Sequence, residues 1–584
     1  MKELEDIAEQ FAAPGGEGEV LQKGLLRKQE QDHNWAFQYW LHSMYLRVPL
    51  ALPVNSNPGM VFPRRQFSTN DAMLLYMAQL IHGAYQWRVK LNSVGLPIDR
   101  CSSRDKGQPL CMEQYHRVMT TYRRPGRSRD YQLDTSSAQA QYIMVCCGGQ
   151  QFQLSLTEDW EPLTVDELAF QLRRCQQMAE QSPDSCQVAL LTSDDRRVWG
   201  ESREALINAD HLNAETLATI ENCLFVVCLD APLPTSFNGR KRLSFDGGVT
   251  DGRDDTAMAH QMLHGGGTLF NTANRWFDKT IQMVVSSDGV SGLCYEHSAA
   301  EGIAVVQLME QLVASAERDD VTLEPPSRPL ESPNQLEWFL NDDVKARIEK
   351  SAVSVDRLID DLDFLVLRFP DYGKNFIKSV RCSPDAFLQL ALQLAYYRLH
   401  DDLVATYESA STRRFRQGRV DCIRAVTPQA LDWVKVMGDV SITRGEKIRL
   451  FRTALHLQTD IMVENILGQG IDIHLLGLQE MATDLGMDTP QLFTHQSFSI
   501  ANHFGLSTSQ VPTQNGESFM GYGAVVPDGY GCSYNPQPDF IVFCIGSFHS
   551  CEMTSSEAFG SSISESLGLM RDLLKSSDAW TSSG

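Results

Sequence analysis

The sequence has no long hydrophobic run, and this absence limits where the protein can act. None of its apolar stretches approaches the ~18 residues that a membrane-spanning helix needs. The first residues, Met1 to Asp6, are largely charged and contain no hydrophobic signal core. We therefore expect a soluble, cytoplasmic protein with no transmembrane segment.

The cysteines lack the spacing that metal sites use. The 14 cysteines are scattered along the chain, with one adjacent pair at Cys146 and Cys147 and no Cys-x-x-Cys anywhere. That is poor spacing for a zinc site, and without a secretory signal it indicates reduced thiols. The sequence predicts no metal site.

Positive charge is in short supply. The chain has 51 Lys and Arg against 74 Asp and Glu, which gives a net charge of −23. The negative electrostatic field of such a chain disfavours general binding to nucleic acids or to anionic membranes. An anionic ligand would need a local cluster of basic residues.

Two motifs that would define common enzyme classes are also missing. His264-Gly265-Gly266-Gly267 resembles the oxyanion loop of an α/β-hydrolase, but no serine has glycine at both −2 and +2. A serine hydrolase needs that nucleophile elbow and is therefore disfavoured. Gly373-Lys374 is followed by asparagine and lacks the upstream glycine of a P-loop. The three glycines are better explained by tight backbone packing.

What the chain does have is length and an ordinary globular composition. Its 584 residues, 42% hydrophobic and 21% charged, are too many for one core and predict two large domains. Residues 317–334 contain four prolines among charged residues and are expected to form an interdomain linker.

Periodicity and turn chemistry predict the main elements. We expect helices in residues 1–45, from about Asp71, at 341–370, and at 384–400, where Ser383 is the expected cap and Pro384 the first helical residue. Strands are expected at 141–145, 187–191, 224–229, 524–527 and 539–545. Residues 280–295 predict a hairpin that turns at Ser287-Asp288-Gly289.

One histidine lies just beyond that hairpin. His297 follows its second arm, and Glu301 comes four residues later. Histidine can take and return a proton near neutral pH without a large change in its pKa. Taken alone, His297 is more readily explained as a histidine in a turn; its neighbours along the chain make a general base the better interpretation.

Two other clusters offer complementary chemistry. In an extended segment, Ser507 and Ser509 share one face, where a hydroxyl could stabilise an oxyanion; a polar strand end is the alternative. Lys374 and Lys378 fall together if their segment is helical, and Arg381 follows. This basic spot could bind a phosphate or could simply be a solvated face.

Together these clusters resemble the choline/carnitine acyltransferase family. The resemblance extends from about Phe11 to Leu574. The segments that carry it are Asn274-Arg275-Trp276-Phe277-Asp278-Lys279, Glu296-His297-Ser298-Ala299-Ala300-Glu301-Gly302, Tyr372-Gly373-Lys374-Asn375-Phe376-Ile377-Lys378, Ser383-Pro384-Asp385-Ala386-Phe387, Tyr407-Glu408-Ser409-Ala410-Ser411, Leu506 to Pro512, and Val525-Val526-Pro527-Asp528-Gly529-Tyr530-Gly531.

The resemblance implies a mixed α/β fold. It predicts two domains similar to chloramphenicol acetyltransferase, each a mixed sheet flanked by helices, with an active-site tunnel between them. The implied division is a helical segment at 1–61 packed on the C-terminal domain, a domain at 62–340 carrying the histidine, and a CoA- and acceptor-binding domain at 341–584.

The resemblance also implies the chemistry. His297 would be the general base that lets an alcohol attack an acyl-CoA directly, with no acyl-enzyme, and Ser509 would donate to the oxyanion. The residues implied to bind CoA are Lys374, Lys378, Asp385, Ser411 and Gln510, with the two lysines on its 3′-phosphate. Acetyl-CoA would be a co-substrate, with no tightly bound cofactor.

The alcohol is predicted from two positions. Carnitine-specific members carry a threonine and an arginine where this chain has Val420 and Ile473, which offer neither hydroxyl nor counter-charge to a carboxylate. Choline needs only aromatic faces and negative potential. We therefore expect acetyl transfer to choline. The implied acceptor-binding residues are Tyr45, Tyr407, Val420, Ile473, Ser507 and Tyr522.

Two alternatives stay open. One is a short-chain carnitine acyltransferase, since Tyr295, Glu301 and Gly302 resemble the carnitine branch. The other is an inactive relative that binds CoA without turnover. The expected partners are choline and acetyl-CoA, with no nucleic acid, and the protein is expected to be a monomer.

Overall fold

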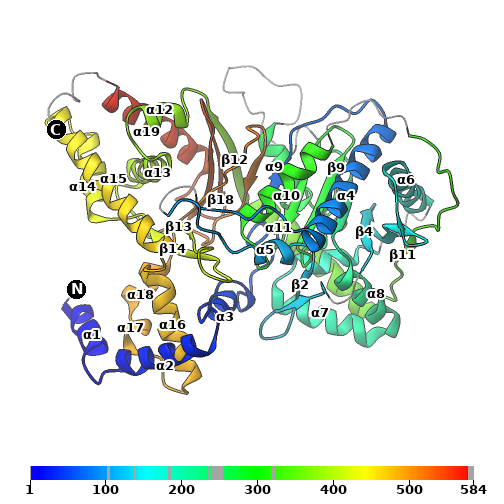
Figure 1. Cartoon of the computed structure of the whole chain (residues 1–584), viewed down its shortest axis with the longest axis horizontal. Helices are drawn as coiled ribbons and strands as arrows, with labels where there is room; N and C mark the ends of the chain where they lie inside the picture. Colours follow the sequence, from blue (N-terminus) through cyan, green and yellow to red (C-terminus); the bar gives the residue numbers. More distant parts are fainter. Residues whose placement is uncertain are drawn as a thin grey trace.

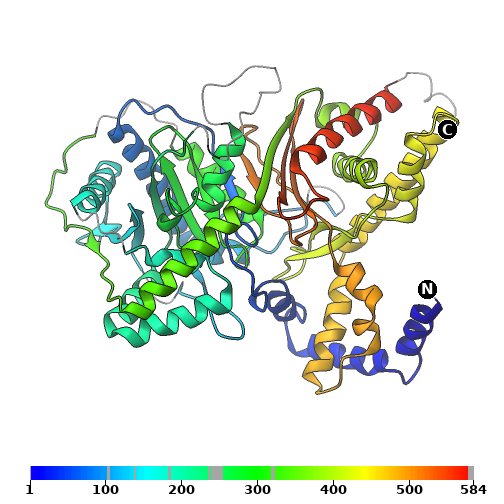
Figure 2. The same ribbon diagram turned by 180° about the vertical axis from the view of Figure 1, so that it is seen from behind.

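Two mixed β-sheets flanked by helices lie side by side in the computed structural model (Figures 1 and 2). The structure describes residues 2–101, 105–136, 140–181, 186–234, 237, 254–316 and 323–575. The predicted fold class, mixed sheets with flanking helices, is confirmed.

The first sheet has eight strands in the order β11-β5-β4-β8-β9-β10-β1-β16. The β4–β8 and β8–β9 pairs are parallel and the other pairs are antiparallel. Its strands are β1 (Gly59–Val61), β4 (Tyr142–Cys147), β5 (Gln150–Ser155), β8 (Val226–Asp230), β9 (Ile281–Ser286), β10 (Ser291–Tyr295), β11 (Asn334–Gln335) and β16 (Phe519–Gly521).

Helices cover both faces of this sheet, and β8, β9 and β10 are therefore buried along their whole length. One hydrophobic core joins the sheet to α4 (Asn70–Ser93), α6 (Val165–Gln181) and α10 (Gly302–Ser315). A second core joins it to α7 (Arg196–Ala209), α8 (His211–Asn222), α9 (Asp255–His264) and α11 (Asp342–Asp361).

The second sheet has six strands in the order β12-β18-β17-β15-β13-β14. Its strands are β12 (Leu362–Phe369), β13 (Thr406–Ser411), β14 (Val420–Arg424), β15 (Leu506–Gln510), β17 (Tyr530–Pro536) and β18 (Ile541–Phe548). A third core packs it against α13 (Pro384–His400), α14 (Pro428–Met437), α15 (Arg444–Ile466) and α19 (Ser556–Leu574).

One strand crosses between the two halves of the chain. β16 comes from the C-terminal part of the sequence, yet it pairs antiparallel with β1 at the edge of the eight-stranded sheet. Met60 and Met520 are partners in this register. The C-terminal half of the chain is therefore joined to the first sheet by backbone hydrogen bonds as well as by side-chain packing.

The N-terminal helices lie beside the C-terminal half of the chain. Leu21 and Leu25 of α2 (Glu17–Gln31) share a small core with Leu478 and Met481 of α16 (Ile471–Asp484). In Figure 1 these blue helices lie below the six-stranded sheet, next to the orange α16. The other N-terminal elements are α1 (Lys2–Ala12), α3 (Phe37–Leu41) and a π-helical turn at His42–Leu46.

The remaining elements are short. They are α5 (Glu113–Arg117), β2 (Thr121–Arg124), β3 (Tyr131–Asp134), β6 (Thr157–Glu158), β7 (Glu161–Pro162), α12 (Lys374–Ser379), α17 (Gln491–Thr494), α18 (Gln496–Asn502) and two 3₁₀ turns at Val188–Ser193 and Thr272–Asn274. Within the predicted linker, residues 317–322 lie outside the described residues and 323–333 form neither helix nor strand.

Local chemistry predicted several elements correctly. The hairpin is confirmed as β9 and β10, with Gly289 at a φ of 87° in the turn. The predicted helix near Asp71 is α4, where the Thr69 hydroxyl caps the Ala72 amide. The helix at 384–400 is α13, although the Ser383 side chain makes no capping hydrogen bond.

Three predicted elements are wrong. Residues 187–191 are not a strand: Gln187 has a φ of 49°, and a buried 3₁₀ turn follows it, since a short apolar run does not distinguish strand from helix. The helix expected at 341–370 ends at Asp361, and β12 follows directly. Residues 524–527 form a loop that includes Pro527, between β16 and β17.

The three glycines after His264 serve packing rather than an oxyanion. Gly265, Gly266 and Gly267 have φ values of 82°, 94° and 103°, a region that favours glycine. A Cβ on Gly265 would lie 2.8 Å from the backbone of Asn271. His264 itself is buried and hydrogen-bonded to His260 at 2.9 Å.

Candidate active site

His297 lies at the boundary between the two sheets. It follows β10, whose residues are all buried, and precedes α10 by five residues. Its side chain exposes 20% of its surface. A neighbouring ring on each side contacts it: Tyr45 stacks at 5.7 Å and Tyr295 lies tilted at 5.3 Å between ring centroids.

Both ring nitrogens of His297 have polar neighbours. The Tyr45 hydroxyl is hydrogen-bonded to Nδ1 at 2.7 Å. On the other side, Nε2 lies 3.8 Å from a carboxylate oxygen of Glu301. The hydroxyl comes from the N-terminal segment and the carboxylate from the start of α10, so two distant parts of the chain orient one imidazole.

An arginine of the second sheet holds the loop around His297. Arg419, just before β14, donates to the backbone carbonyls of Ser298 at 2.6 Å and His297 at 2.9 Å. Its Nε also donates to Glu301 at 2.7 Å. The arginine side chain is only 3% exposed, and its guanidinium lies over the Trp40 ring at 4.5 Å. The loop is thereby fixed to both halves of the chain.

The surroundings favour the neutral form of His297. Burial lowers the pKa of the imidazole below its ordinary value, and the charge of Arg419 acts in the same direction. The carboxylates of Glu301 and Glu296 oppose this shift. A histidine with a lowered pKa is unprotonated near neutral pH and can accept a proton.

His297 opens onto a cavity of about 560 Å³ that both halves of the chain line. Nine of the residues predicted for the site line it: Tyr45, His297, Tyr407, Ser411, Val420, Ser507, Ser509, Gln510 and Tyr522. The structure therefore brings together residues spread over more than 450 positions, from Tyr45 to Tyr522.

The hydroxyl-bearing segment is a strand, as predicted from its sequence. β15 pairs parallel with both β13 and β17, in the middle of the six-stranded sheet. Ser507 and Ser509 are two residues apart on it, which places them on one face. Ser507 is buried, Ser509 half-buried and Gln510 exposed, so the strand runs outward along the cavity wall.

Ile473 does not line the cavity. It packs instead in a small core with Val420 and the side chains of Trp40 and Tyr45, all of which do line it. Its backbone amide donates to Asp421 at 3.3 Å. Burial raises the pKa of Asp421 to about 6. Ile473 is thus one layer behind the cavity wall.

Three of the residues predicted to bind CoA also lie outside this cavity. Lys374 and Lys378 are four residues apart on α12, so they share a face; Lys374 is half-buried and Lys378 exposed. Neither has an ion-pair partner among the described residues. Asp385, at the start of α13, accepts a hydrogen bond from Tyr534 at 2.7 Å.

Asp385 is nevertheless connected to the strand that lines the cavity. Gln389 of α13 donates to both the Tyr534 hydroxyl and the Thr508 hydroxyl, each at 2.9 Å. Nearby, burial raises the pKa of Glu408 well above its ordinary value, and the neighbouring Asp385 carboxyl adds to the shift. This buried polar group links α13 to β13 and β15.

Sequence reasoning missed the residues that hold His297 in place. Arg419 belongs to the Gly-Arg-Val-Asp segment that locates Val420, but that segment assigns the arginine no role. Arg123 belongs to none of the motifs. Both contact residues more than 100 positions away, so no local pattern indicates them. An arginine flanked by glycine in a strand-like segment is at most a weak signal.

The described part of the chain has neither a group of metal-binding side chains nor a membrane-spanning helix. No group of three or more His, Cys, Asp or Glu residues is placed to hold a metal ion there. No described helix is long and apolar enough to cross a membrane.

The cavity has a histidine at its wall and is lined from both halves of the chain, and sequence comparison assigns the class of protein. The sequence profile of the Choline/Carnitine o-acyltransferase family matches residues 1–565. The chain belongs to this family, as its motifs predicted.

The relatives include choline and carnitine O-acetyltransferases, and the choline enzymes named here are more similar to this chain than the carnitine enzyme. The choline O-acetyltransferase of Drosophila melanogaster is 44% identical over 98% of this chain and 84% of its own length. The human choline O-acetyltransferase is 43% identical over 97% of this chain and 74% of its own. The carnitine O-acetyltransferase of Columba livia is 37% identical over 99% and 89%.

Solved structures add little. The condensation domain of the enacyloxin polyketide synthase covers 92% of this chain and 82% of its own at 10% identity, with a TM-score of 0.33. That similarity is too low to support an argument.

Proposed function

We propose that the protein transfers the acetyl group of acetyl-CoA to choline, giving acetylcholine and CoA. The observation that carries this proposal is the cavity that joins His297 to Val420 and β15. The greater identity to choline O-acetyltransferases than to the carnitine relative supports the choice of alcohol.

His297 is the general base in this proposal. The Tyr45 hydroxyl occupies Nδ1, which leaves Nε2 to exchange the proton. Nε2 takes the proton of the choline hydroxyl as its oxygen attacks the thioester carbonyl. Ser509 donates to the resulting oxyanion, which is where a fixed donor stabilises the transition state most. When the carbon–sulfur bond breaks, His297 returns the proton to the CoA thiolate.

The CoA-binding residues are proposed at the outer end of the same strand. Lys374 and Lys378 give an acidic protein one basic face suited to the 3′-phosphate. Ser411 and Gln510 line the cavity toward its exposed end, and Asp385 lies behind them on α13. Acetyl-CoA is a co-substrate here, not a tightly bound cofactor.

The acceptor end is aromatic, and the described residues that line it offer no free cation. Tyr45, Tyr407 and Tyr522 line the cavity near Val420, with Ser507 on the adjoining strand and Ile473 behind. Aromatic faces attract a quaternary ammonium. The two arginines that line the cavity are already paired, Arg123 with Asp130 and Glu296 and Arg413 with Asp99, so a carboxylate would find no partner.

The remaining predictions belong to the same proposal. We infer that the chain divides into a helical segment at 1–61 and domains at 62–340 and 341–584. The packing of α2 on α16 and the cavity lined from both halves support that division. The protein is proposed to work as a monomer in the cytoplasm.

The direct test is release of the CoA thiol from acetyl-CoA with and without choline. Choline-dependent release, together with formation of acetylcholine, is the expected result. Stabilisation by CoA without any transfer would identify an inactive CoA-binding relative instead. Release without any alcohol would indicate hydrolysis and contradict the proposal.

The pH dependence of kcat/KM for choline reports the state of His297. Protonation removes the base, so we expect kcat/KM to fall about tenfold per pH unit on the acid side. Because the pKa of His297 is lowered, this loss should begin below the ordinary histidine value. Rates measured from about pH 5 to about pH 9 give the midpoint.

Replacing Glu301 with glutamine tests whether the acid side of this pH profile belongs to His297. The carboxylate of Glu301 raises the pKa of His297, so its removal should move the acid limb to still lower pH. A midpoint that moves to higher pH would contradict the assignment of the limb to His297.

A further inference from the structure

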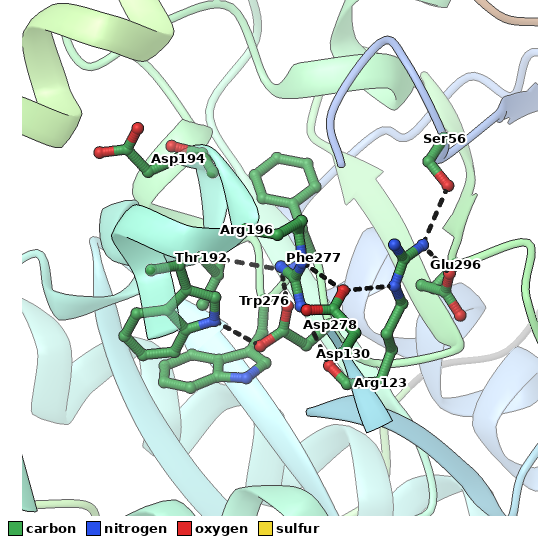
Figure 3. Close-up of polar contacts among 12 residues, drawn as sticks. Ser56, Arg123, Asp130, Thr192, Asp194, Arg196, Trp276, Phe277, Asp278 and Glu296 are labelled. Carbon is green, nitrogen blue, oxygen red and sulfur yellow. Dashed lines mark hydrogen bonds and ion pairs between the residues drawn. The ribbon is translucent and has the colours of Figure 1, made fainter. Parts of the chain in front are cut away.

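A chain of buried ion pairs leads from the interior of the first half to Glu296, the residue before His297 (Figure 3). Asp130 accepts from the Nε atoms of both Arg123 and Arg196, each at 2.7 Å. Arg196 also pairs with Asp278 at 2.6 Å, and Arg123 with Glu296 at 3.1 Å. The two arginines are 1% and 2% exposed, and the three carboxylates are fully buried.

Three members of this chain hold the segment that carries Tyr45. Arg123 donates to the Tyr45 carbonyl at 2.7 Å. The backbone amide of Asp130 donates to the Leu46 carbonyl at 2.7 Å, and that of Arg196 to the Pro49 carbonyl at 2.8 Å. Tyr45 and Leu46 end the π-helical turn and residues 47–49 form neither helix nor strand, so these contacts hold the segment against the first half of the chain.

The same arginine reaches the other side of the Tyr45–His297 hydrogen bond. Arg123 Nη1 donates to Glu296, the residue before His297. Glu296 in turn accepts from the amide of Ser298 at 3.1 Å and from its hydroxyl at 2.6 Å, which closes the loop around the histidine. One guanidinium therefore contacts both Tyr45 and the residue that precedes His297.

Stability alone is a poor explanation for such a chain. Removing two arginines and three carboxylates from water costs free energy, and well-packed apolar residues often stabilise a core as much. What a planar guanidinium offers is several hydrogen bonds in a fixed geometry. The benefit of this arrangement is geometric.

We propose that Arg123 is a positioning residue for the reaction: it sets the distance and angle between the Tyr45 hydroxyl and His297 by binding the Tyr45 carbonyl and the Glu296 carboxylate together. Asp130, Arg196 and Asp278 hold Arg123 in turn. The inference rests on the proposed role of His297 as the base.

Arg123→Lys tests this, with Arg275→Lys as the matched control, because Arg275 is also a buried, ion-paired arginine of the first half of the chain. A lysine keeps the positive charge, but its N–H donors all lie on one nitrogen, whereas Arg123 reaches Asp130, Glu296 and Tyr45 from three separate nitrogens. We expect R123K to lower kcat about 10- to 100-fold, because misplacing a catalytic group costs this much, and to leave KM for acetyl-CoA within about threefold. R275K loses the buried contacts of Arg275 to Asp230, which lie outside this chain of ion pairs and involve neither Tyr45 nor Glu296. It should lower the melting temperature with kcat nearly unchanged.

Two further measurements separate positioning from stability. In a Tyr45→Phe background, R123K should cost much less kcat than in the wild type, because the contact it orients is already absent. The second measurement is the NMR signal of ¹³Cε1-labelled histidine, with the His297 peak assigned from H297A. R123K should shift this peak and R275K should not. If R123K does not fold, Glu296→Gln carries the same test, since it removes the charge that Arg123 contacts.

The outcomes also separate this inference from the proposed function. A wild-type protein without acyl transfer, but with a His297 signal that moves in R123K, would refute the function and support the positioning. Equal losses of kcat in R123K and R275K would overturn the inference. So would a His297 signal that is unmoved in R123K, or in E296Q where that variant replaces it.

Discussion

Replacing His297 with alanine is expected to lower kcat for acetyl transfer about 10³-fold, within the range found for loss of a general base. Among the described residues that line the cavity, His297 is the only histidine, so no second imidazole is in place to take the proton. The residues proposed to bind the 3′-phosphate, Lys374 and Lys378, do not line the cavity, so acetyl-CoA should still bind. Thiol release measures turnover, and calorimetry with CoA measures binding.

Two variants make this test specific. His297→Gln keeps a polar side chain for Tyr45 but cannot carry the proton, so it should be as inactive as H297A. His456→Ala, at an exposed position of α15, should behave like the wild type. Turnover by H297A within about tenfold of the wild type would refute the assignment of the base.

The preference for choline over carnitine should be large. Carnitine's carboxylate would lie beside Val420 with both lining arginines already paired, a desolvation cost of several kcal/mol. Since about 1.4 kcal/mol corresponds to a factor of ten, we expect kcat/KM for choline to exceed that for carnitine by about 10²-fold or more. Steady-state assays with acetyl-CoA and each alcohol decide this, and a higher value for carnitine would refute the choline assignment.

Ile473→Arg should shift this preference. Ile473 lies behind Val420, and an arginine there is long enough to extend past the valine toward the cavity. The new cation should raise kcat/KM for carnitine by about tenfold, as expected for a partly buried ion pair. It should also reduce kcat/KM for choline by repulsion.

Ile473→Gln is the matched control because it adds hydrogen-bonding groups without charge. If I473Q gains as much carnitine activity as I473R, the charge argument is wrong. Asp421 offers a second possible partner for the arginine, since its carboxylate already accepts from the amide of residue 473. An I473R variant with unchanged selectivity would indicate that the arginine pairs there and does not reach the cavity.

The sequence predicted most of the cavity because its motifs lie at the ends of regular elements. A turn with Asp288 and Gly289 places His297 after a strand, and alternation places Ser507 and Ser509 on one face. Each of these depends on a few neighbouring residues. Turn chemistry and strand periodicity depend on neighbouring residues alone, and the hairpin and the strand that they predict are present in the structure.

What the sequence did not predict depends on contacts between distant segments. Arg419 binds the carbonyls of His297 and Ser298, and Arg123 binds that of Tyr45, and no local pattern records either contact. Ile473 was placed in the acceptor pocket by resemblance, whereas a layer of Val420 and Tyr45 separates it from the cavity. The 3₁₀ turn at Val188–Ser193 was taken for a strand because its six buried residues are consistent with either.

The strand β16 has a consequence for how the protein is made. The eight-stranded sheet receives its last strand from Phe519–Gly521, more than 180 residues after β11, the preceding strand of that sheet in the sequence. During synthesis, β10 can pair with one edge of β1, but the other edge stays unpaired until most of the chain has emerged. An open edge is a site of aggregation. Chains that stop before residue 519 are left with this edge permanently exposed.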